Sequence, residues 1–169
     1  LWGREFNPQS LSVECFFVLS GRLMAEILFV RNSPLGRFYV HRVSRIFPAL
    51  WLFVFSMLVA TQFAPRLNVD WRGVLTALTF TRNYIPSEDC LGHIWSLCVE
   101  EHAYILLSLI ALAARRTSIA VVPILLTITA AMALNGMAGY WLFQRETPYW
   151  ASDVRIASIL ISAAMFLSL

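Results

Sequence analysis

Polar side chains recur at every fourth position in an apolar stretch near the middle of the chain. These residues are Ser96, Glu100, Tyr104 and Ser108. Such spacing places side chains on one face of a helix. An ionised group inside a membrane span costs about 2.5 to 3.5 kcal/mol on insertion, so Glu100 is a candidate functional residue. Glu100 could orient a substrate hydroxyl or a catalytic imidazole, and the alternative is a structural ion pair.

Charged residues also interrupt two other apolar stretches. Glu14, Arg22 and Glu26 fall within one sector of an expected helix near the N-terminal end, where Arg22 can pair with Glu26 at four-residue spacing. Arg155 lies in the last apolar stretch, with serines on the same side of the expected helix. Opposite charges on different helices suggest a polar cavity, and we expect Glu100 and Arg155 to be partners.

Arginines are concentrated in two connections between apolar stretches. The connection 31–45 contains four arginines and no acid, and Arg115 and Arg116 follow the third apolar stretch. We therefore expect both connections to face the cytoplasm. Within the first connection, Arg42 and Arg45 could bind the phosphate groups of a nucleotide-containing ligand in bidentate fashion. The alternative is that these two arginines only anchor the connection on its side of the membrane.

The sequence lacks the patterns of several other chemistries. His93 and His102 would project from opposite sides of a helix, so a zinc pair is disfavoured and no metal site is predicted. His102 also points away from Glu100, without an evident orienting partner. Ser20 does not lie in a GxSxG motif, and the three cysteines have no CxxC spacing. The arginines lie between apolar runs, which does not favour binding to nucleic acid.

The composition indicates the kind of scaffold that holds these residues. Of the 169 residues, 59% are hydrophobic and 14% are charged, and the mean hydropathy is +0.67. We predict an all-α, polytopic transmembrane helix bundle with about five spans plus one interfacial helix. The expected spans are 11–30, 46–64, 94–114, 118–134 and 149–169, and the expected interfacial helix is 71–84.

Two prolines refine this prediction. Pro48 is expected in the first turn of the second span, with Ser44 as the N-cap, where a proline does not interrupt a helix. Pro123 is expected inside the fourth span and predicts a kink there.

Four strings, in order along the chain, carry a family resemblance. They are FFVLSG at 16–21, FYVHRVSRIFPALW at 38–51, HIWSLCVEEHAYILL at 93–107 and DVRIASILISAA at 153–164. Together they resemble signature blocks of the membrane acyltransferase-3 family, whose bacterial members acylate lipopolysaccharide, exopolysaccharide and nodulation factors. The four strings extend over nearly the whole chain, so the resemblance is far more specific than any one of them.

The resemblance implies a multi-pass enzyme of the bacterial inner membrane that transfers an acyl group to a sugar hydroxyl. The implied donor is acyl-CoA, commonly acetyl-CoA, with no bound cofactor, and the implied acceptor is a glycan or a lipid-linked sugar. Glu100 is the candidate catalytic residue. The candidate substrate-binding residues are Arg42, Arg45, Glu14, Trp95, Ser96, Tyr104 and Arg155.

Some features depart from the family's pattern. Arg22 stands where the family often has Phe, and Glu14 stands where it usually has Asp. The family's catalytic histidine lies in a helix before the FFVLSG block. We therefore expect residues 1–169 to be a partial acyltransferase domain, truncated at both ends and inactive alone.

A multi-pass transporter of a small polar substrate is the main alternative, because buried charges and a kinked span also describe a substrate pathway. A packing module without chemistry of its own is a further alternative. Transport predicts inverted repeats, and the sequence contains no visible internal repeat. Acyl transfer predicts that labelled acyl groups enter a glycan in a manner that depends on Arg42 and Arg45.

Overall fold

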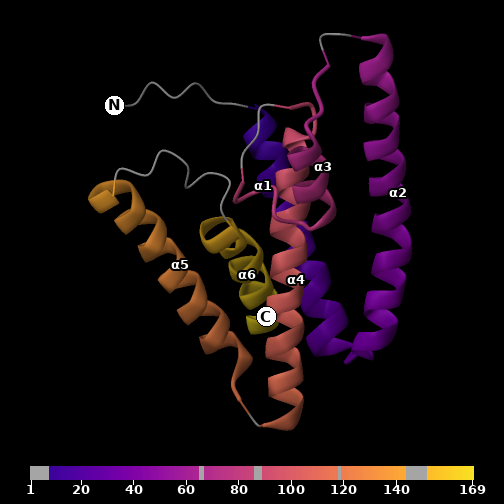
Figure 1. The fold of residues 1–169 in the computed structure, drawn as a ribbon. Coiled ribbons are helices and arrows are strands. Elements are labelled where there is room, and N and C mark those ends of the chain that lie inside the picture. Colours follow the sequence, from indigo (N-terminus) through magenta and orange to yellow (C-terminus); the bar gives the residue numbers. More distant parts are fainter. Residues whose placement is uncertain (1–7, 65–66, 86–88, 118, 144–151) are drawn as a thin grey trace.

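The computed structural model describes residues 8–64, 67–85, 89–117, 119–143 and 152–169, which form helices joined by turns and short connections (Figure 1). In chain order the elements are α1 (Pro8–Ala25), the π-helix η1 (Glu26–Val30), α2 (Leu35–Phe63), α3 (Trp71–Leu78), the 3-10 helix η2 (Gly92–Ile94), α4 (Trp95–Arg116), α5 (Val121–Phe143) and α6 (Ser152–Ser168). These described residues contain no strand, which confirms the all-α prediction.

Consecutive long helices alternate in direction. In Figure 1, α1, α4 and α6 run downward, whereas α2 and α5 run upward. The connections after η1 and after α4 therefore meet at the lower end, where the Arg115 guanidinium donates to the carbonyl oxygens of Leu28 at 3.0 Å and Ser33 at 2.9 Å. The two arginine-rich connections thus share one end of the bundle. That this end faces the cytoplasm stays a prediction.

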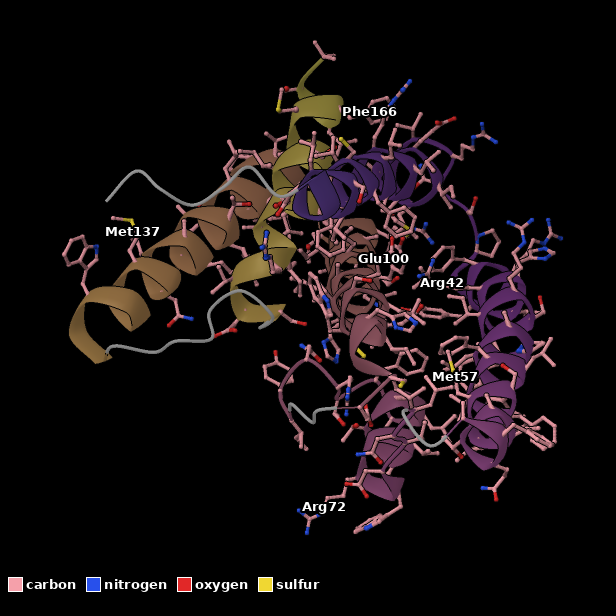
Figure 2. All side chains as sticks on the ribbon, turned by 90° about the horizontal axis from the view of Figure 1, so that it is seen from above. Arg42, Met57, Arg72, Glu100, Met137 and Phe166 are labelled. Atoms are coloured by element: carbon pink, nitrogen blue, oxygen red, sulfur yellow. The ribbon has the colours of Figure 1, made fainter. Side chains whose placement is uncertain are left out.

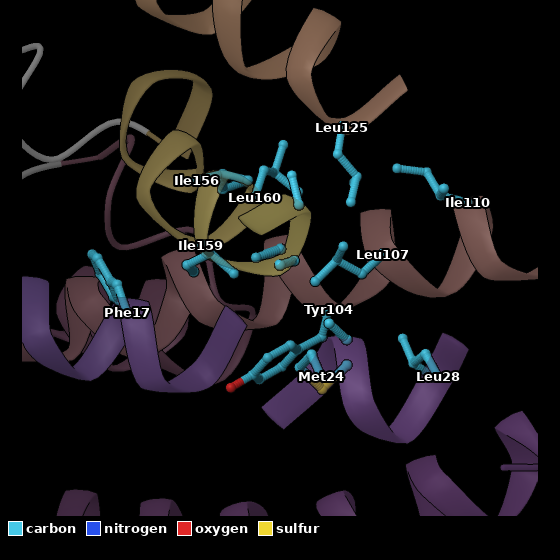
Figure 3. Packing of buried hydrophobic residues seen from close by; sticks show 14 of the residues in the cluster. Phe17, Met24, Leu28, Tyr104, Leu107, Ile110, Leu125, Ile156, Ile159 and Leu160 are labelled. Carbon is cyan, nitrogen blue, oxygen red and sulfur yellow. The ribbon is translucent and has the colours of Figure 1, made fainter. Parts of the chain in front are cut away.

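The main hydrophobic core lies between α1, α4 and α6 (Figure 3), with α5 packed along its outer side. Its large buried side chains include Phe17, Met24, Leu28, Tyr104, Leu107, Ile159 and Leu160. A smaller cluster joins α2 to α3 and to the start of α4. Its buried members are Leu50, Val54, Ala77, Leu91, Ile94 and Cys98.

The helices α1 and α6 cross with their backbones in contact. A Cβ atom added at Gly21 would collide with the backbone carbonyl group of Ile159. Nearby, the Ser162 hydroxyl donates a hydrogen bond of 2.6 Å to the carbonyl oxygen of Val18. Glycine is required at this crossing because any larger residue would force the two helices apart.

The helix α2 starts earlier than the sequence predicts. It begins at Leu35, so most of the arginine-rich segment belongs to the helix and Pro48 lies inside it. The Ser44 hydroxyl donates to the carbonyl oxygen of His41 within the helix. The predicted N-cap at Ser44 and the predicted first-turn position of Pro48 are therefore wrong. Arginine is a good helix former, and a charged segment can continue a helix beyond an apolar span.

Three described helices are long and apolar enough to cross a membrane. They are Leu35–Phe63, Gly92–Arg116 and Val121–Gly139. The prediction of about five spans is not confirmed, because α1 and α6 are not among these three helices, and α6 has only 17 residues. The predicted span 149–169 starts outside the described residues. Many large apolar side chains on α2 and α5 are exposed, as expected for surfaces that face lipid.

The predicted kink at Pro123 is wrong. The helix α5 begins at Val121, so Pro123 lies in its first turn. A proline is tolerated there because the first N–H groups of a helix have no partner within the helix. The helix also continues past the predicted end at residue 134, to Phe143.

Arg22 and Glu26 do not form the predicted pair. Glu26 instead binds Arg31 at 2.6 Å, and the Arg22 guanidinium lies 5.6 Å from the centre of the Phe166 ring. The cause is the π-helix η1, in which the Arg31 N–H donates to the Glu26 carbonyl oxygen. In a π-helix, side chains five residues apart lie together, whereas in an α-helix this holds for side chains four residues apart.

The predicted interfacial helix 71–84 is shorter than expected, because α3 ends at Leu78. A turn follows in which Arg82 is buried and forms an ion pair with Asp89. The side chains of this pair are 2% and 1% exposed. Arg82 is therefore part of the protein interior, and the prediction that it lies at the membrane surface is wrong.

Candidate active site around Glu100

Glu100 lies at the centre of a buried polar cluster between α1, α2 and α4 (Figure 2). Its Oε1 atom accepts hydrogen bonds from the Ser20 hydroxyl on α1 and, at 2.7 Å, from the Tyr104 hydroxyl one turn along α4. Its Oε2 atom faces Nη2 of Arg42 on α2 at 3.7 Å. Ser20, Arg42, Glu100, Glu101 and Tyr104 form what we call the Glu100 cluster. The predicted polar face of α4 therefore points into the protein.

Arg42 is held from two directions. Its Nε and Nη2 atoms donate to Oε1 of Glu101 at 2.8 and 2.7 Å. Its guanidinium carbon lies 3.4 Å from the centre of the Tyr104 ring, which places the cation against the ring face. The Nη1 atom of Arg42 has no hydrogen-bond partner among the described residues.

The Glu100 cluster holds more negative than positive charge. Two carboxylates, Glu100 and Glu101, face the single guanidinium of Arg42. Glu100 itself is only 3% exposed. Farther along the same face of α4, the buried Ser108 hydroxyl has no hydrogen-bond partner among the described residues. The cluster can therefore accept a proton or a positively charged group without disturbing a balanced ion pair.

The predicted pairing of Glu100 with Arg155 is wrong. Arg155 on α6 pairs with Glu14 on α1, and Glu14 also accepts a 2.8 Å hydrogen bond from Ser158. Glu14 faces α6, whereas Glu100 faces α1 and α2. Helical periodicity gives the direction of a side chain around its own helix but not which neighbouring helix lies in that direction.

Three other candidate residues lie outside the Glu100 cluster. Trp95 is in the core, with its ring edge-on to Phe17 at a centroid distance of 6.3 Å. The Ser96 hydroxyl donates to the carbonyl oxygen of His93 at 3.3 Å. Arg45 is exposed on α2, one turn beyond Arg42. The structure therefore unites Arg42, Glu100 and Tyr104, and leaves these three apart.

The sequence did not indicate that Ser20 and Glu101 belong to the Glu100 cluster, or that His102 contacts Ser152. Ser20 lies in the FFVLSG string, and Glu101 follows Glu100 directly, but neither has a spacing that marks its partner. His102 points away from Glu100, as predicted, but it does have a partner, because its Nδ1 atom lies 2.8 Å from the Ser152 hydroxyl. The two residues are fifty positions apart, so no local pattern could reveal this contact.

No group of His, Cys, Asp and Glu suited to a metal ion occurs among the described residues. The carboxylate oxygens of Glu100 face two hydroxyl groups and a guanidinium. Its chemistry is therefore that of a buried carboxylate.

Comparison with known proteins connects this geometry to a family. A Bacillus subtilis (strain 168) protein named as the peptidoglycan O-acetyltransferase YrhL is 28% identical over 188 residues, which cover 95% of this chain and 29% of that protein. The O-acetyltransferase OatA of Staphylococcus aureus (strain NCTC 8325 / PS 47) is 30% identical over 118 residues, covering 59% of this chain and 20% of OatA.

A third relative carries a different kind of name. The regulator of hypoxia-inducible factor 1 of Caenorhabditis elegans is 28% identical over 118 residues, covering 62% of this chain and 23% of that protein. The chain thus spans less than a third of the length of each of these relatives. No solved structure matches it closely enough for comparison. The sequence model of the acyltransferase-domain family matches residues 5–168. This chain therefore belongs to the acyltransferase-3 family.

Proposed function

We propose that this chain forms the membrane part of an O-acyltransferase that moves an acyl group from acyl-CoA to a hydroxyl group of a glycan or lipid-linked sugar. Acetyl is the proposed acyl group, because two relatives are named as O-acetyltransferases. The proposed location is the bacterial inner membrane. The apolar helices support a membrane location, and the family supports acyl transfer.

The position of Glu100 is the observation that carries this proposal. A sugar hydroxyl is a weak nucleophile near neutral pH and needs a base within hydrogen-bond reach. Glu100 is a carboxylate buried in the protein, with one oxygen bonded to the hydroxyls of Ser20 and Tyr104. Its other oxygen, Oε2, has only the more distant guanidinium of Arg42 beside it.

We infer that Oε2 is the atom of Glu100 that accepts a proton or a hydrogen bond during the reaction. In the proposed reaction, the acceptor oxygen attacks the thioester carbon, and its proton passes to Oε2 or to an imidazole that Oε2 orients. The carbon–sulfur bond then breaks, and the thiolate of coenzyme A leaves with that proton. Glu100 is regenerated as a carboxylate, and Ser20 and Tyr104 keep it in one orientation throughout.

Arg42 is the proposed contact for the phosphate groups of the donor. One edge of its guanidinium already binds Glu101, so a phosphate group would bind through Nη1 or displace Glu101. Arg45 is exposed one turn further along α2 and would add a second positive charge at longer range. A guanidinium suits this role because its planar donors match phosphate oxygens.

The test uses the full-length protein in membrane vesicles supplied with acetyl-CoA that carries a labelled acetyl group. Glu100→Gln keeps the side-chain shape but removes the charge and the proton acceptor. We expect it to lower label transfer to glycan roughly 100-fold or more. Glu26→Gln is the matched control, because Glu26 is a carboxylate that pairs with the exposed Arg31, and it should transfer label like the unchanged protein.

Two results would contradict the proposal. One is near-normal transfer by Glu100→Gln at a normal amount of folded protein, which would leave Glu100 a packing role. The other is movement of a labelled sugar across the vesicle membrane without any acyl donor, which would favour a transporter.

A further inference from the structure

An apolar groove lies where α4 and α5 diverge from the short connection between them. In Figure 1, α5 slants away from α4 as it rises from this connection, at the lower end of the bundle. The groove has a volume of about 250 Å³, and every side chain that lines it is apolar. The lining includes Leu109, Ile110 and Ala113 of α4, Ile119 of the connection and Ile124 of α5.

The groove has an exposed rim and a buried floor. Leu109 and Ile119 are 58% and 42% exposed, whereas Ile110 is only 9% exposed. Both α4 and α5 belong to the helices that are long and apolar enough to cross a membrane. Because an apolar cavity does not hold water, hydrocarbon is the natural content of this groove in a bilayer.

Arg116 continues the face of α4 that lines the groove. Leu109, Ala113 and Arg116 follow one another at spacings of four and three residues, which places them on one face of the helix. A helical side chain also leans toward the N-terminal end of its helix, so we expect Arg116 to lean back toward the groove. Since α4 ends at Arg116, the charge lies at the end of the span, and Leu109 lies about 10 Å deeper along the helix.

The protein does not neutralise the positive charge of Arg116. This residue is exposed, and its side chain has no ion pair or hydrogen bond among the described residues. The neighbouring Arg115 adds a second positive charge, which is directed to two backbone carbonyl oxygens. No acidic residue occurs in the sequence between Glu101 and Glu146. The groove and Arg116 are therefore complementary to a molecule that joins a hydrocarbon chain to an anionic group.

We propose that this groove binds one acyl chain of an anionic phospholipid, whose phosphate group contacts Arg116. A guanidinium suits this role because its planar donors match phosphate oxygens. The lipid belongs to the leaflet at the arginine-rich end of the bundle and fills the space between α4 and α5. The site is separate from the proposed acyl transfer, because the groove lies between α4 and α5, whereas Glu100 faces α1 and α2.

The experiment uses the full-length protein in phosphatidylcholine vesicles that contain a small fraction of phosphatidylglycerol with a photoreactive diazirine in its acyl chain. After illumination, digestion and mass spectrometry locate the attached lipid. We expect attachment within residues 109–124. Phosphatidylcholine that carries the same diazirine chain, at the same fraction, should attach there roughly fivefold less, which is the effect of one basic residue beside an anionic headgroup.

Two substitutions test the headgroup contact and the chain contact separately. Arg116→Gln should lower phosphatidylglycerol attachment in the groove roughly fivefold. Arg37→Gln is its matched control, because it removes an exposed arginine of α2 at the same end of the bundle, and it should attach lipid normally. Ala113→Phe fills the groove and should lower the attachment of both lipids there. Ala130→Phe adds the same ring at an exposed position of α5 outside the groove and should have no effect.

Three results would overturn the proposal. One is equal attachment of the two lipids that Arg116→Gln does not change, which would leave a groove that takes any acyl chain. Another is attachment spread evenly over the exposed apolar faces of α2 and α5. The third is folded protein whose groove stays unlabelled, as expected if a second copy or another segment of the protein fills it. None of these results depends on acyl transfer, which Glu100→Gln tests separately.

Discussion

The Glu100 cluster and the Arg82–Asp89 pair are both buried ionic sites, but they differ in charge balance. Arg82 and Asp89 match one positive with one negative charge, and Asp89 also accepts the backbone N–H of Leu91 at 3.1 Å. The pair is packed so closely that a Cβ atom at Gly73 would collide with the Asp89 carboxylate. In the Glu100 cluster, one guanidinium faces two carboxylates.

This difference separates a structural role from a chemical one. A balanced and enclosed pair has no capacity for a further ligand, and breaking it leaves an uncompensated charge in the interior. A cluster with an additional carboxylate can take up a proton or a cation. We therefore expect changes at Asp89 to act on folding, and changes in the Glu100 cluster to act on acyl transfer by protein that is still folded.

The largest effect is expected for Asp89→Asn, which removes the charge that compensates buried Arg82. Loss of one partner of a buried pair costs about 3 to 5 kcal/mol. Thermal melting of the detergent-solubilised full-length protein should show this loss, whereas acyl transfer per folded molecule stays normal. The double variant Arg82→Met with Asp89→Leu should recover most of the stability, because no charge is left unpaired. An equal melting temperature for Asp89→Asn and the unchanged protein would contradict a structural role for the Arg82–Asp89 pair.

The next effect concerns the hydroxyl that orients Glu100. Tyr104→Phe removes the 2.7 Å hydrogen bond to Oε1, and a hydrogen bond to a charged group contributes about 1.5 to 3 kcal/mol. We expect acyl transfer to fall roughly 10- to 100-fold if that energy is lost in the reacting state. Tyr39→Phe is the matched control, because its hydroxyl makes only a 3.5 Å contact with the Tyr104 carbonyl oxygen. Equal activity of both variants would show that orientation of Glu100 is unimportant.

Arg42→Lys and Arg45→Lys test whether position within the cluster matters more than positive charge. Lysine keeps the charge but loses the planar donors that bind Glu101 and would bind phosphate. We expect Arg42→Lys to raise the apparent KM for acetyl-CoA roughly tenfold, about 1.4 kcal/mol, and Arg45→Lys to leave it unchanged. Membrane insertion should be normal in both. An unchanged apparent KM for acetyl-CoA in both variants would leave both arginines only the anchoring role.

The smallest effect is expected in the Glu14–Arg155 pair, which is balanced and partly exposed. Ser158→Ala removes one 2.8 Å hydrogen bond to Glu14 and leaves the ion pair in place. We expect about 1 kcal/mol of lost stability and no change in acyl transfer per folded molecule. A clear loss of activity at normal stability would place this pair in the substrate site, as the sequence alone suggested.

The sequence correctly predicts the direction of a side chain where that direction depends only on the helix that carries it. Its four-residue spacing correctly places Glu100 and Tyr104 on one buried face and His102 on another. Its apolar stretches correctly predict an all-helical protein. Both are properties of a single helix, and the spacing of side chains is the same in every regular α-helix.

Contacts between helices are where prediction from the sequence fails. Glu100 meets Arg42 and not Arg155 because the rotation and height of each helix depend on packing over its whole length. The π-helix η1 adds a local cause, since one wider turn redirects Glu26 toward Arg31. Neither the crossing of two helices nor a π-turn has a spacing pattern that the sequence displays.

The contact between Gly21 and the Ile159 backbone has a mechanical consequence. Because the backbones of α1 and α6 touch, neither helix can move toward the other, and Ser20 keeps a constant position on α1. By contrast, α2 stands at the edge of the molecule (Figure 1) and buries only Leu50 and Val54 among its residues. We therefore expect α2 to be the helix that moves outward if a substrate enters beside Glu100, and such a movement would break the contact between Arg42 and Glu101.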